Sequence, residues 1–124
     1  MVAVNGTAAG AGVGLALMGD IVIAARSARF LLSFVKLGAA LDGGTSLLVQ
    51  RAIGAPRARA LALLGEPLTA EAAAQWGLIW KVVDDEALMS EALAAAQSEA
   101  FATNDLREGA AAFIEKRAPA FSGR

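Results

Sequence analysis

The sequence contains neither cysteine nor histidine, and these two absences exclude several kinds of catalytic site. Without cysteine, the 124-residue chain can form no disulfide bond, no reactive thiolate and no cysteine-based zinc site. Without histidine, it cannot supply the imidazole of a Ser–His or Cys–His catalytic relay. The chain therefore cannot carry out the chemistry of these classes of protein with its own side chains.

A charge excess of either sign is also missing. The 11 basic and 12 acidic residues leave a net charge of −1, so the chain offers no basic field for nucleic acid. The apolar run near the start is interrupted by glycines and by Asp20, short of the roughly 20 residues that cross a membrane. We expect no basic leader segment. We expect a cytoplasmic protein that binds neither nucleic acid nor membrane.

Apolar residues, by contrast, are abundant. They make up 56% of the sequence, and the mean hydropathy is +0.53. A chain of this length can bury only a modest core, and many of its apolar residues are small alanines. We therefore expect it to cover apolar surface against partner subunits as well as within itself.

Residues 5–20, NGTAAGAGVGLALMGD, are the most distinctive stretch. They predict a bare glycine-rich turn between a short strand and a helix, which could present backbone N–H groups to an anion. The alternative is that the small residues only allow two elements to approach closely. The dinucleotide-binding pattern is absent, because Leu15 follows Gly10-x-Gly12 where glycine is required, and no Walker lysine follows.

Alternating strand and helix signals predict an α/β fold. Short apolar runs indicate strands at residues 2–4, 20–25 and 28–32, and an extended segment at 78–83. Helices are expected at residues 12–18, 45–53, 57–64, 70–76, 86–102 and 104–117, with a loop containing a helical turn at 33–42.

Terminal signals accompany several of these helices. Gly19 is expected to end the first helix, and Thr45 and Thr69 to cap the second and fourth. Asn104 and Asp105 are expected to cap the last helix.

A series of motifs, taken in order, resembles one protein family. The motifs are NG at residues 5–6, AGAG at 9–12, LAL at 15–17, ARF at 28–30, LDGGT at 41–45, LGEPLTA at 64–70, WGL at 76–78 and FIEKR at 113–117. Together they resemble the crotonase family of enoyl-CoA hydratases and isomerases. The resemblance implies a partial crotonase fold within the α/β class. Short strands of a ββα spiral core would occupy residues 1–83, and a C-terminal helical segment would occupy 84–124 of the same domain.

The chain departs from the family pattern in two places. In the family, a long N-terminal half precedes the position of Met1. Some dozens of residues also separate the helix that begins near Glu86 from the segment FATND, which here follows almost at once at 101–105. We therefore expect the C-terminal half of a crotonase fold, from which an internal helical piece is also missing.

The resemblance implies a backbone site for a coenzyme A thioester. In the family, two backbone N–H groups hold the thioester oxygen as it becomes an enolate. Here the matching segment is Gly10-Ala11-Gly12, so the N–H of Ala11 is the expected donor, and Gly10 and Gly12 are expected to contact the substrate. The second donor would belong to the N-terminal half. The thioester is the substrate, and we expect no cofactor and no metal.

The acid–base residues implied by the resemblance favour an isomerase over a hydratase. The two glutamates of the hydratases correspond to Gly14 and Phe34, neither of which can transfer a proton. The phenylacetate-pathway isomerases instead place an aspartate in a Pro-Asp-x-Gly-Gly-Thr turn, where this chain has Asp42. We expect burial beside Phe34 and Leu41 to raise the pKa of Asp42. The turn is one residue shorter here and has Leu41 in place of proline, and the alternative role for Asp42 is that of a turn residue.

Further expectations also follow from the resemblance. Phe34 is expected to contact the acyl group, and Lys116 the phosphates of coenzyme A, with solvation as the alternative for the lysine. A homo-oligomer, either a trimer or a dimer of trimers, is expected. Two functional classes stay open: an acyl-CoA enzyme, of the isomerase type or related to hydratases, and a non-catalytic assembly module that keeps crotonase trimer contacts.

Overall fold

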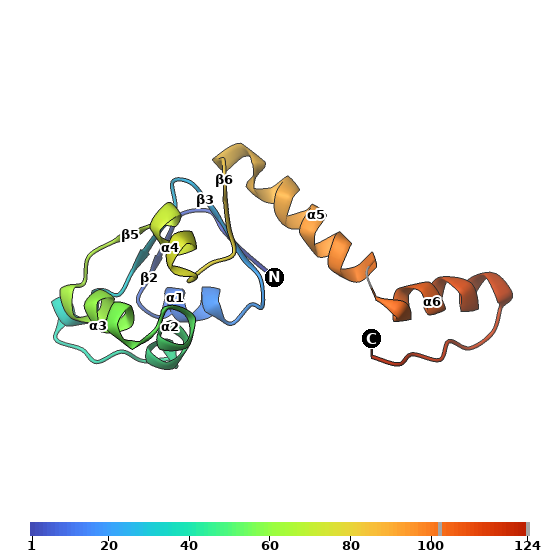
Figure 1. Ribbon diagram of the computed structural model, residues 1–124, viewed down its shortest axis with the longest axis horizontal. Helices are drawn as coiled ribbons and strands as arrows, with labels where there is room; N and C mark the ends of the chain where they lie inside the picture. Colours follow the sequence, from blue (N-terminus) through green and yellow to red (C-terminus); the bar gives the residue numbers. More distant parts are fainter. Residues whose placement is uncertain (102, 124) are drawn as a thin grey trace. The chain divides into compact units, whose positions relative to one another are not determined.

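The structure is a computed structural model that describes residues 1–101 and 103–123, with no account of the side chains of 98–101. Its internal contacts divide the chain into a first unit, residues 1–92, and a second unit, residues 93–124. The two units are coloured from blue to yellow and from orange to red in Figure 1. The expected division between residues 83 and 84 of a single domain stays a prediction.

The strands of the first unit form two small sheets (Figure 1). In the first sheet, all three strands run parallel, in the order β1 (Val2–Val4), β3 (Val22–Ala25) and β6 (Lys81–Val83). In the second sheet, β2 (Thr7–Ala9) is parallel to β4 (Arg29–Leu31), which pairs antiparallel with β5 (Leu68–Thr69). The expected strands at 2–4, 20–25 and 28–32 are therefore confirmed, whereas β2 and β5 were not predicted.

The first four strands form two consecutive pairs, each pair gives one strand to each sheet, and a helix follows each pair. The strands β1 and β2 precede α1 (Ala11–Leu17), and β3 and β4 precede the 3-10 helix η1 (Ser33–Leu37) and α2 (Thr45–Ile53). Each strand of the second pair lies parallel beside its counterpart in the first pair. This is the arrangement expected for a partial crotonase core, and it makes successive ββα units neighbours along both sheets.

Two further helices complete the first unit, and both carry the predicted terminal residues. The helix α3 (Ala55–Leu64) has a proline in its first turn and ends at Gly65 in the left-handed conformation. The helix α4 (Ala70–Trp76) is capped by Thr69, whose Oγ1 accepts a hydrogen bond of 3.2 Å from the N–H of Ala72. The sequence was sufficient to predict these helix ends because each signal acts within one turn of the helix.

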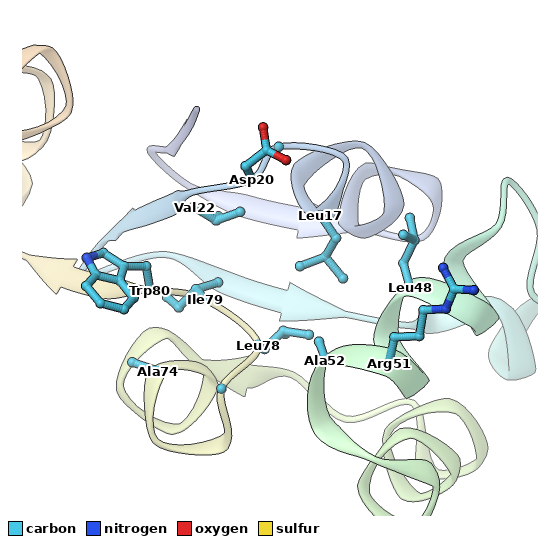
Figure 2. Close-up of a pocket in the computed structure, with 12 residues that line it drawn as sticks. Leu17, Asp20, Val22, Leu48, Arg51, Ala52, Ala74, Leu78, Ile79 and Trp80 are labelled. Carbon is cyan, nitrogen blue, oxygen red and sulfur yellow. The ribbon is translucent and has the colours of Figure 1, made fainter. Parts of the chain in front are cut away.

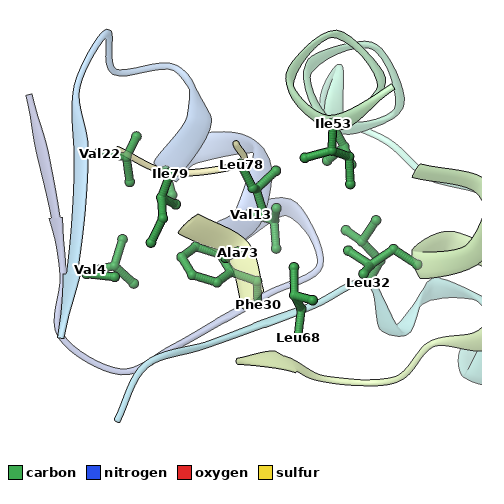
Figure 3. Close-up of a cluster of buried hydrophobic side chains, with 14 of the residues drawn as sticks. Val4, Val13, Val22, Phe30, Leu32, Ile53, Leu68, Ala73, Leu78 and Ile79 are labelled. Atoms are coloured by element: carbon green, nitrogen blue, oxygen red, sulfur yellow. The ribbon is translucent and has the colours of Figure 1, made fainter. Parts of the chain in front are cut away.

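The core lies where the two sheets meet the helices. Phe30 of β4 is fully buried, and Figure 3 shows Val4, Val13 and Leu68 around it. The strand β3 is buried at all four positions, as its continuous apolar sequence predicted. The core therefore joins both sheets to α1, and so fixes the start of that helix relative to β4.

Gly19 is required for a reason other than the one predicted. The helix α1 ends at Leu17 with Met18 as its cap, and Gly19 is not in the left-handed conformation. A Cβ atom at Gly19 would lie 2.6 Å from Cγ2 of Val2. The expected helix-ending role was wrong, and the glycine instead allows the chain to pass close to β1.

The chain leaves the first sheet through η2 (Asp85–Ala87) into α5 (Leu88–Phe101). The expected end of this helix at residue 102 lies outside the described residues. The helix α6 (Asn104–Glu115) follows, and its cap is Thr103, whose Oγ1 accepts a hydrogen bond of 3.2 Å from the N–H of Leu106. The predicted cap at Asn104 and Asp105 was one residue late. None of the described helices is long and apolar enough to span a bilayer.

In the second unit, the tail folds back along α6. The guanidinium of Arg117 donates hydrogen bonds of 2.5 and 3.0 Å to the carboxylate of Glu108, which also accepts one of 2.9 Å from the N–H of Ala120. Phe121 lies over Gly109, where a Cβ atom would approach its ring to 3.4 Å. These bonds, led by that from Arg117, lower the pKa of Glu108 from 4.5 to about 2.

The Glu108 contact predicts a pH dependence of the tail. Because the pKa of Glu108 is lower in the folded state, its stabilising effect is present above pH 4.5 and is lost as the pH falls towards about 2. The protection factor of the Ala120 amide, which compares its exchange with that of an unstructured peptide at the same pH, should therefore fall as the pH is lowered through this window. The Glu108→Gln variant should have a low protection factor at Ala120 that does not change across the window. Protection of Ala120 that persists unchanged in Glu108→Gln would contradict the assignment.

Candidate functional site

The helix α1 begins directly at the end of β2. Gly10 has φ 55°, and its N–H donates a hydrogen bond of 2.8 Å to the carbonyl oxygen of Leu31, extending the pairing of β2 with β4. Ala11 is the first residue of α1, so its N–H has no acceptor within the helix, and no hydrogen bond recorded for the described residues uses it. The N–H of Ala11, which is the predicted donor, is thus available to a ligand.

Phe34 lies against this turn. A Cβ atom built on Gly10 would be 3.6 Å from Cζ of Phe34, whose ring is buried. Two residues that the sequence predicted as substrate contacts, Gly10 and Phe34, are therefore brought together by the path of the chain from β4 into η1. Gly12 follows within α1 and has open space where a Cβ atom would be.

The helices α1 and α2 meet at a close contact between Gly14 and Thr45. A Cβ atom at Gly14 would lie only 2.6 Å from Oγ1 of Thr45 and 3.5 Å from the carbonyl oxygen of Gly43. Glycine at position 14 therefore permits this approach, and a larger residue would displace Thr45 or the turn before it.

Thr45 does not cap α2 as predicted. The cap residue is Gly44, in the left-handed conformation, and Thr45 is the first residue of the helix. Its Oγ1 is fully buried and has no hydrogen-bond partner among the described residues. The hydroxyl of Thr45 points towards Gly14 of α1. Gly43 and Gly44 turn the chain so that α2 begins at Thr45, and the cap position is therefore taken by Gly44.

Asp42 lies at the start of the turn that leads into α2. Its carbonyl oxygen accepts a hydrogen bond of 2.9 Å from the N–H of Thr45, and Gly43 and Gly44 between them have φ of 57° and 74°. The side chain of Asp42 is exposed, so the predicted burial beside Phe34 and Leu41 was wrong. The carboxylate is accessible to a ligand, in a turn whose last residue contacts α1.

Lys116 is described apart from these residues because it belongs to the second unit. It ends α6 in the left-handed conformation with φ 52°, and its side chain is exposed. Five of the six predicted site residues (Gly10, Ala11, Gly12, Phe34 and Asp42) thus lie on α1 or on segments of the first unit that contact it, and the sixth, Lys116, belongs to the second unit.

A hollow of about 630 Å³ in the first unit was not predicted. Figure 2 shows Leu17, Leu48 and Leu78 around it, with Asp20 and Arg51 on separate sides. It lies by the C-terminal end of α1, whereas the predicted site residues lie by the N-terminal end. Its walls come from segments far apart in the sequence, so no local pattern could indicate it. Within the described residues, no cluster of acidic side chains could hold a metal ion.

Comparisons with known proteins show the family to which the chain belongs. Residues 1–100 match the sequence model of the enoyl-CoA hydratase/isomerase family. The 1,2-epoxyphenylacetyl-CoA isomerase of Escherichia coli K12 is 42% identical over 158 residues, covering 98% of this chain and 60% of that protein. A probable enoyl-CoA hydratase of Rhodobacter capsulatus is 38% identical, covering 100% and 62%. The crystal structure of an enoyl-CoA hydratase/isomerase from Pseudoalteromonas atlantica superposes with a TM-score of 0.74 at 32% identity, covering 98% and 64%.

The fold is a partial crotonase fold. This chain belongs to the enoyl-CoA hydratase/isomerase family. It spans about 60% of the length of the curated relatives it matches. Because the match to the E. coli protein extends over 158 residues and this chain has 124, that relative also has residues within the matched region that have no counterpart here.

The contact at Gly14 predicts the effect of adding one methyl group. Gly14→Ala should lower the free energy of unfolding by about 1–3 kcal/mol, because Thr45 occupies the space that the methyl group needs. The control is Gly12→Ala in the same helix, where the space is open and the change should be close to neutral. Urea unfolding measures both. A Thr45→Ala substitution should recover part of the loss, and a cost of Gly14→Ala that is unchanged by Thr45→Ala would show that the contact is not the cause.

Proposed function

We propose that the residues around the start of α1 form part of an acyl-CoA isomerase site, in which Asp42 moves a proton between two carbon atoms of an enoyl thioester. The observation that carries this proposal is the contact of Gly14 with Thr45. Thr45 bonds the carbonyl oxygen of Asp42, so the contact holds the turn that bears the carboxylate against the helix that begins with Ala11.

The proposed reaction is a 1,3-proton shift. The carboxylate of Asp42 takes a proton from C2 of a 3-enoyl thioester, and the electron pair moves onto the thioester oxygen. The N–H of Ala11 donates a hydrogen bond to this oxygen, and such a donor can contribute roughly 3 kcal/mol to the transition state. The carboxyl group then returns the proton at C4, which gives the 2-enoyl thioester. A single carboxylate is sufficient for both transfers.

Hydration is less well supported by the same residues. A hydratase of the two-glutamate kind needs a carboxylate at each of positions 14 and 34, and these carry a glycine in a closed contact and a buried aromatic ring. Relatives bear both names: the E. coli protein is called an isomerase and the R. capsulatus protein a probable hydratase. The lack of a carboxylate at positions 14 and 34 favours an isomerase.

The substrate contacts in this proposal are those of a coenzyme A thioester. Gly10 and Gly12 shape the turn around the thioester, Phe34 contacts the acyl group, and the exposed Lys116 meets the phosphates of coenzyme A. No cofactor or metal is required for a proton shift. In a homo-oligomer, which the sequence analysis predicts, Lys116 of a neighbouring subunit would reach the phosphates of coenzyme A.

A non-catalytic assembly module is the second candidate. Large apolar side chains are exposed in the second unit, with Phe113 at 86% and Ile114 at 78%. Such a pair on one helix favours burial against another protein surface. An assembly module would keep these contacts and need no accessible carboxylate at Asp42.

Substitution of Asp42 separates the two candidates. The protein for this test is the chain joined behind the residues that precede the matched segment in the E. coli relative, so that a second N–H donor is present. Asp42→Asn keeps the shape and removes the base, so turnover of 3-hexenoyl-CoA should fall by about 10²-fold or more. Affinity for the thioester, measured by calorimetry, should persist.

The matched control is Asp20→Asn, which removes another exposed carboxylate, beyond the other end of α1. It should leave turnover unchanged. If Asp42→Asn retains the activity of the parent protein, Asp42 is a turn residue before α2 and the base lies elsewhere. If the parent protein binds no thioester, the assembly module is the better account.

A further inference from the structure

The hollow shown in Figure 2 lies between the C-terminal end of α1, the start of β3, the helices α2 and α4, and the segment that leads into β6. Its volume of about 630 Å³ falls in the range of about 300–1,000 Å³ that is usual for sites of small molecules. All of the residues that line it belong to the first unit. The reaction proposed above does not use this hollow, because that reaction takes place by the other end of α1.

The floor of the hollow is apolar and is held in place by the core. Leu78 and Ile79 are only 3% and 5% exposed, and the N–H of Leu78 donates a hydrogen bond of 2.8 Å to the carbonyl oxygen of Ala73. The N–H of Trp80 donates one of 2.9 Å to the carbonyl oxygen of Val22 on β3. These bonds fix the segment without a ligand, so a ligand would bind to a floor that is already formed.

The walls above this floor carry apolar side chains that are open to solvent. The indole of Trp80 is 75% exposed, and Leu17 and Leu48 are only partly buried. Ala52 lies one turn after Leu48 on the same face of α2 and is exposed. A ligand in the hollow would remove this surface from water, which favours the binding of an apolar group.

One cationic side chain stands beside this apolar surface. Arg51 follows Leu48 by three residues on α2, so the two share a helix face, and both line the hollow. Arg51 is exposed, and no ion pair or hydrogen bond recorded for the described residues uses its guanidinium. The planar fork of N–H donors on a guanidinium matches the two oxygen atoms of a carboxylate.

The charges on the walls restrict the chemical class of the ligand. Among the described residues that line the hollow, Arg51 is the one cation, and Asp20 lies on a different side (Figure 2). A single guanidinium can pair with one carboxylate, whereas the several phosphates of coenzyme A would require more cations. The ligand that fits is therefore an apolar chain that ends in one carboxylate.

We propose that this hollow binds a medium-chain fatty acid. The carboxylate would pair with the guanidinium of Arg51, and the alkyl chain would lie over Leu48 and Leu78 towards the indole of Trp80. A methylene group occupies roughly the 30 Å³ that a water molecule takes in the liquid, so a ten-carbon chain fills about half of the hollow. This inference rests on the hollow and not on the proposed reaction at Asp42.

Titration of the 124-residue chain with decanoate, followed by NMR, tests the proposal. Because the chain has two tryptophans, Trp76→Phe identifies the indole N–H signal of Trp80. This signal should shift and saturate with a Kd of about 0.1–1 mM. Arg51→Gln should raise the Kd about tenfold, because the charge-assisted hydrogen bonds are lost, and Arg51→Lys should raise it less.

The matched control is Arg59→Gln, which removes an exposed arginine of α3 outside the hollow and should leave the Kd unchanged. Absence of a saturable shift of the Trp80 signal, or an equal Kd in Arg51→Gln, would overturn the proposal. Tighter binding of decanoyl-CoA than of decanoate at this signal would show that a thioester is the ligand, and would also overturn it. None of these results bears on Asp42, which is tested by turnover.

A second pair of variants tests the apolar part of the hollow. Ala52→Phe places a ring in the space that the alkyl chain needs and should abolish the shift of the Trp80 signal. Ala60→Phe adds the same ring at an exposed position of α3 outside the hollow, and it should leave the Kd unchanged. Binding of decanoate that persists in Ala52→Phe, or that is lost equally in both variants, would contradict the proposed location.

Discussion

The close approach of α1 to α2 is the constraint on which the arrangement of this protein depends. Gly14 and Thr45 meet without room for a single additional methyl group. This contact joins a helix that starts with an available N–H to a turn that carries an exposed carboxylate. Without this contact, the glycine-rich segment and the Asp42 turn would be separate surface features and would not form one site.

The two-sheet architecture explains why the contact forms. Because each successive pair of strands enters both sheets, α1 and α2 occupy equivalent positions in consecutive ββα units and lie side by side. The buried ring of Phe30 anchors β4 beneath them, and the chain then passes Phe34 alongside Gly10.

Much of this could be predicted from sequence, for identifiable reasons. Continuous apolar runs indicated β3 and β4, and Thr69 and Gly65 marked helix ends, because these signals act over a few residues. The strand β2 was missed, since Thr7–Ala9 looks like a turn until β4 pairs with it. Gly19 and Thr45 were given local roles, but each is decided by a tertiary contact, with Val2 and Gly14 respectively. The exposure of Asp42 likewise depends on the path of a turn that family resemblance could not specify.

The products formed from a 3-enoyl thioester separate a proton shift from hydration most directly. The chain, completed by the preceding residues of the E. coli relative, would be incubated with 3-hexenoyl-CoA in D₂O and the products identified by NMR. With Asp42 as the single base and no carboxylate at positions 14 and 34, the product should be 2-hexenoyl-CoA with no 3-hydroxyhexanoyl-CoA beyond the background without protein. Accumulation of the 3-hydroxy product at the rate of isomerisation or faster would contradict an isomerase site.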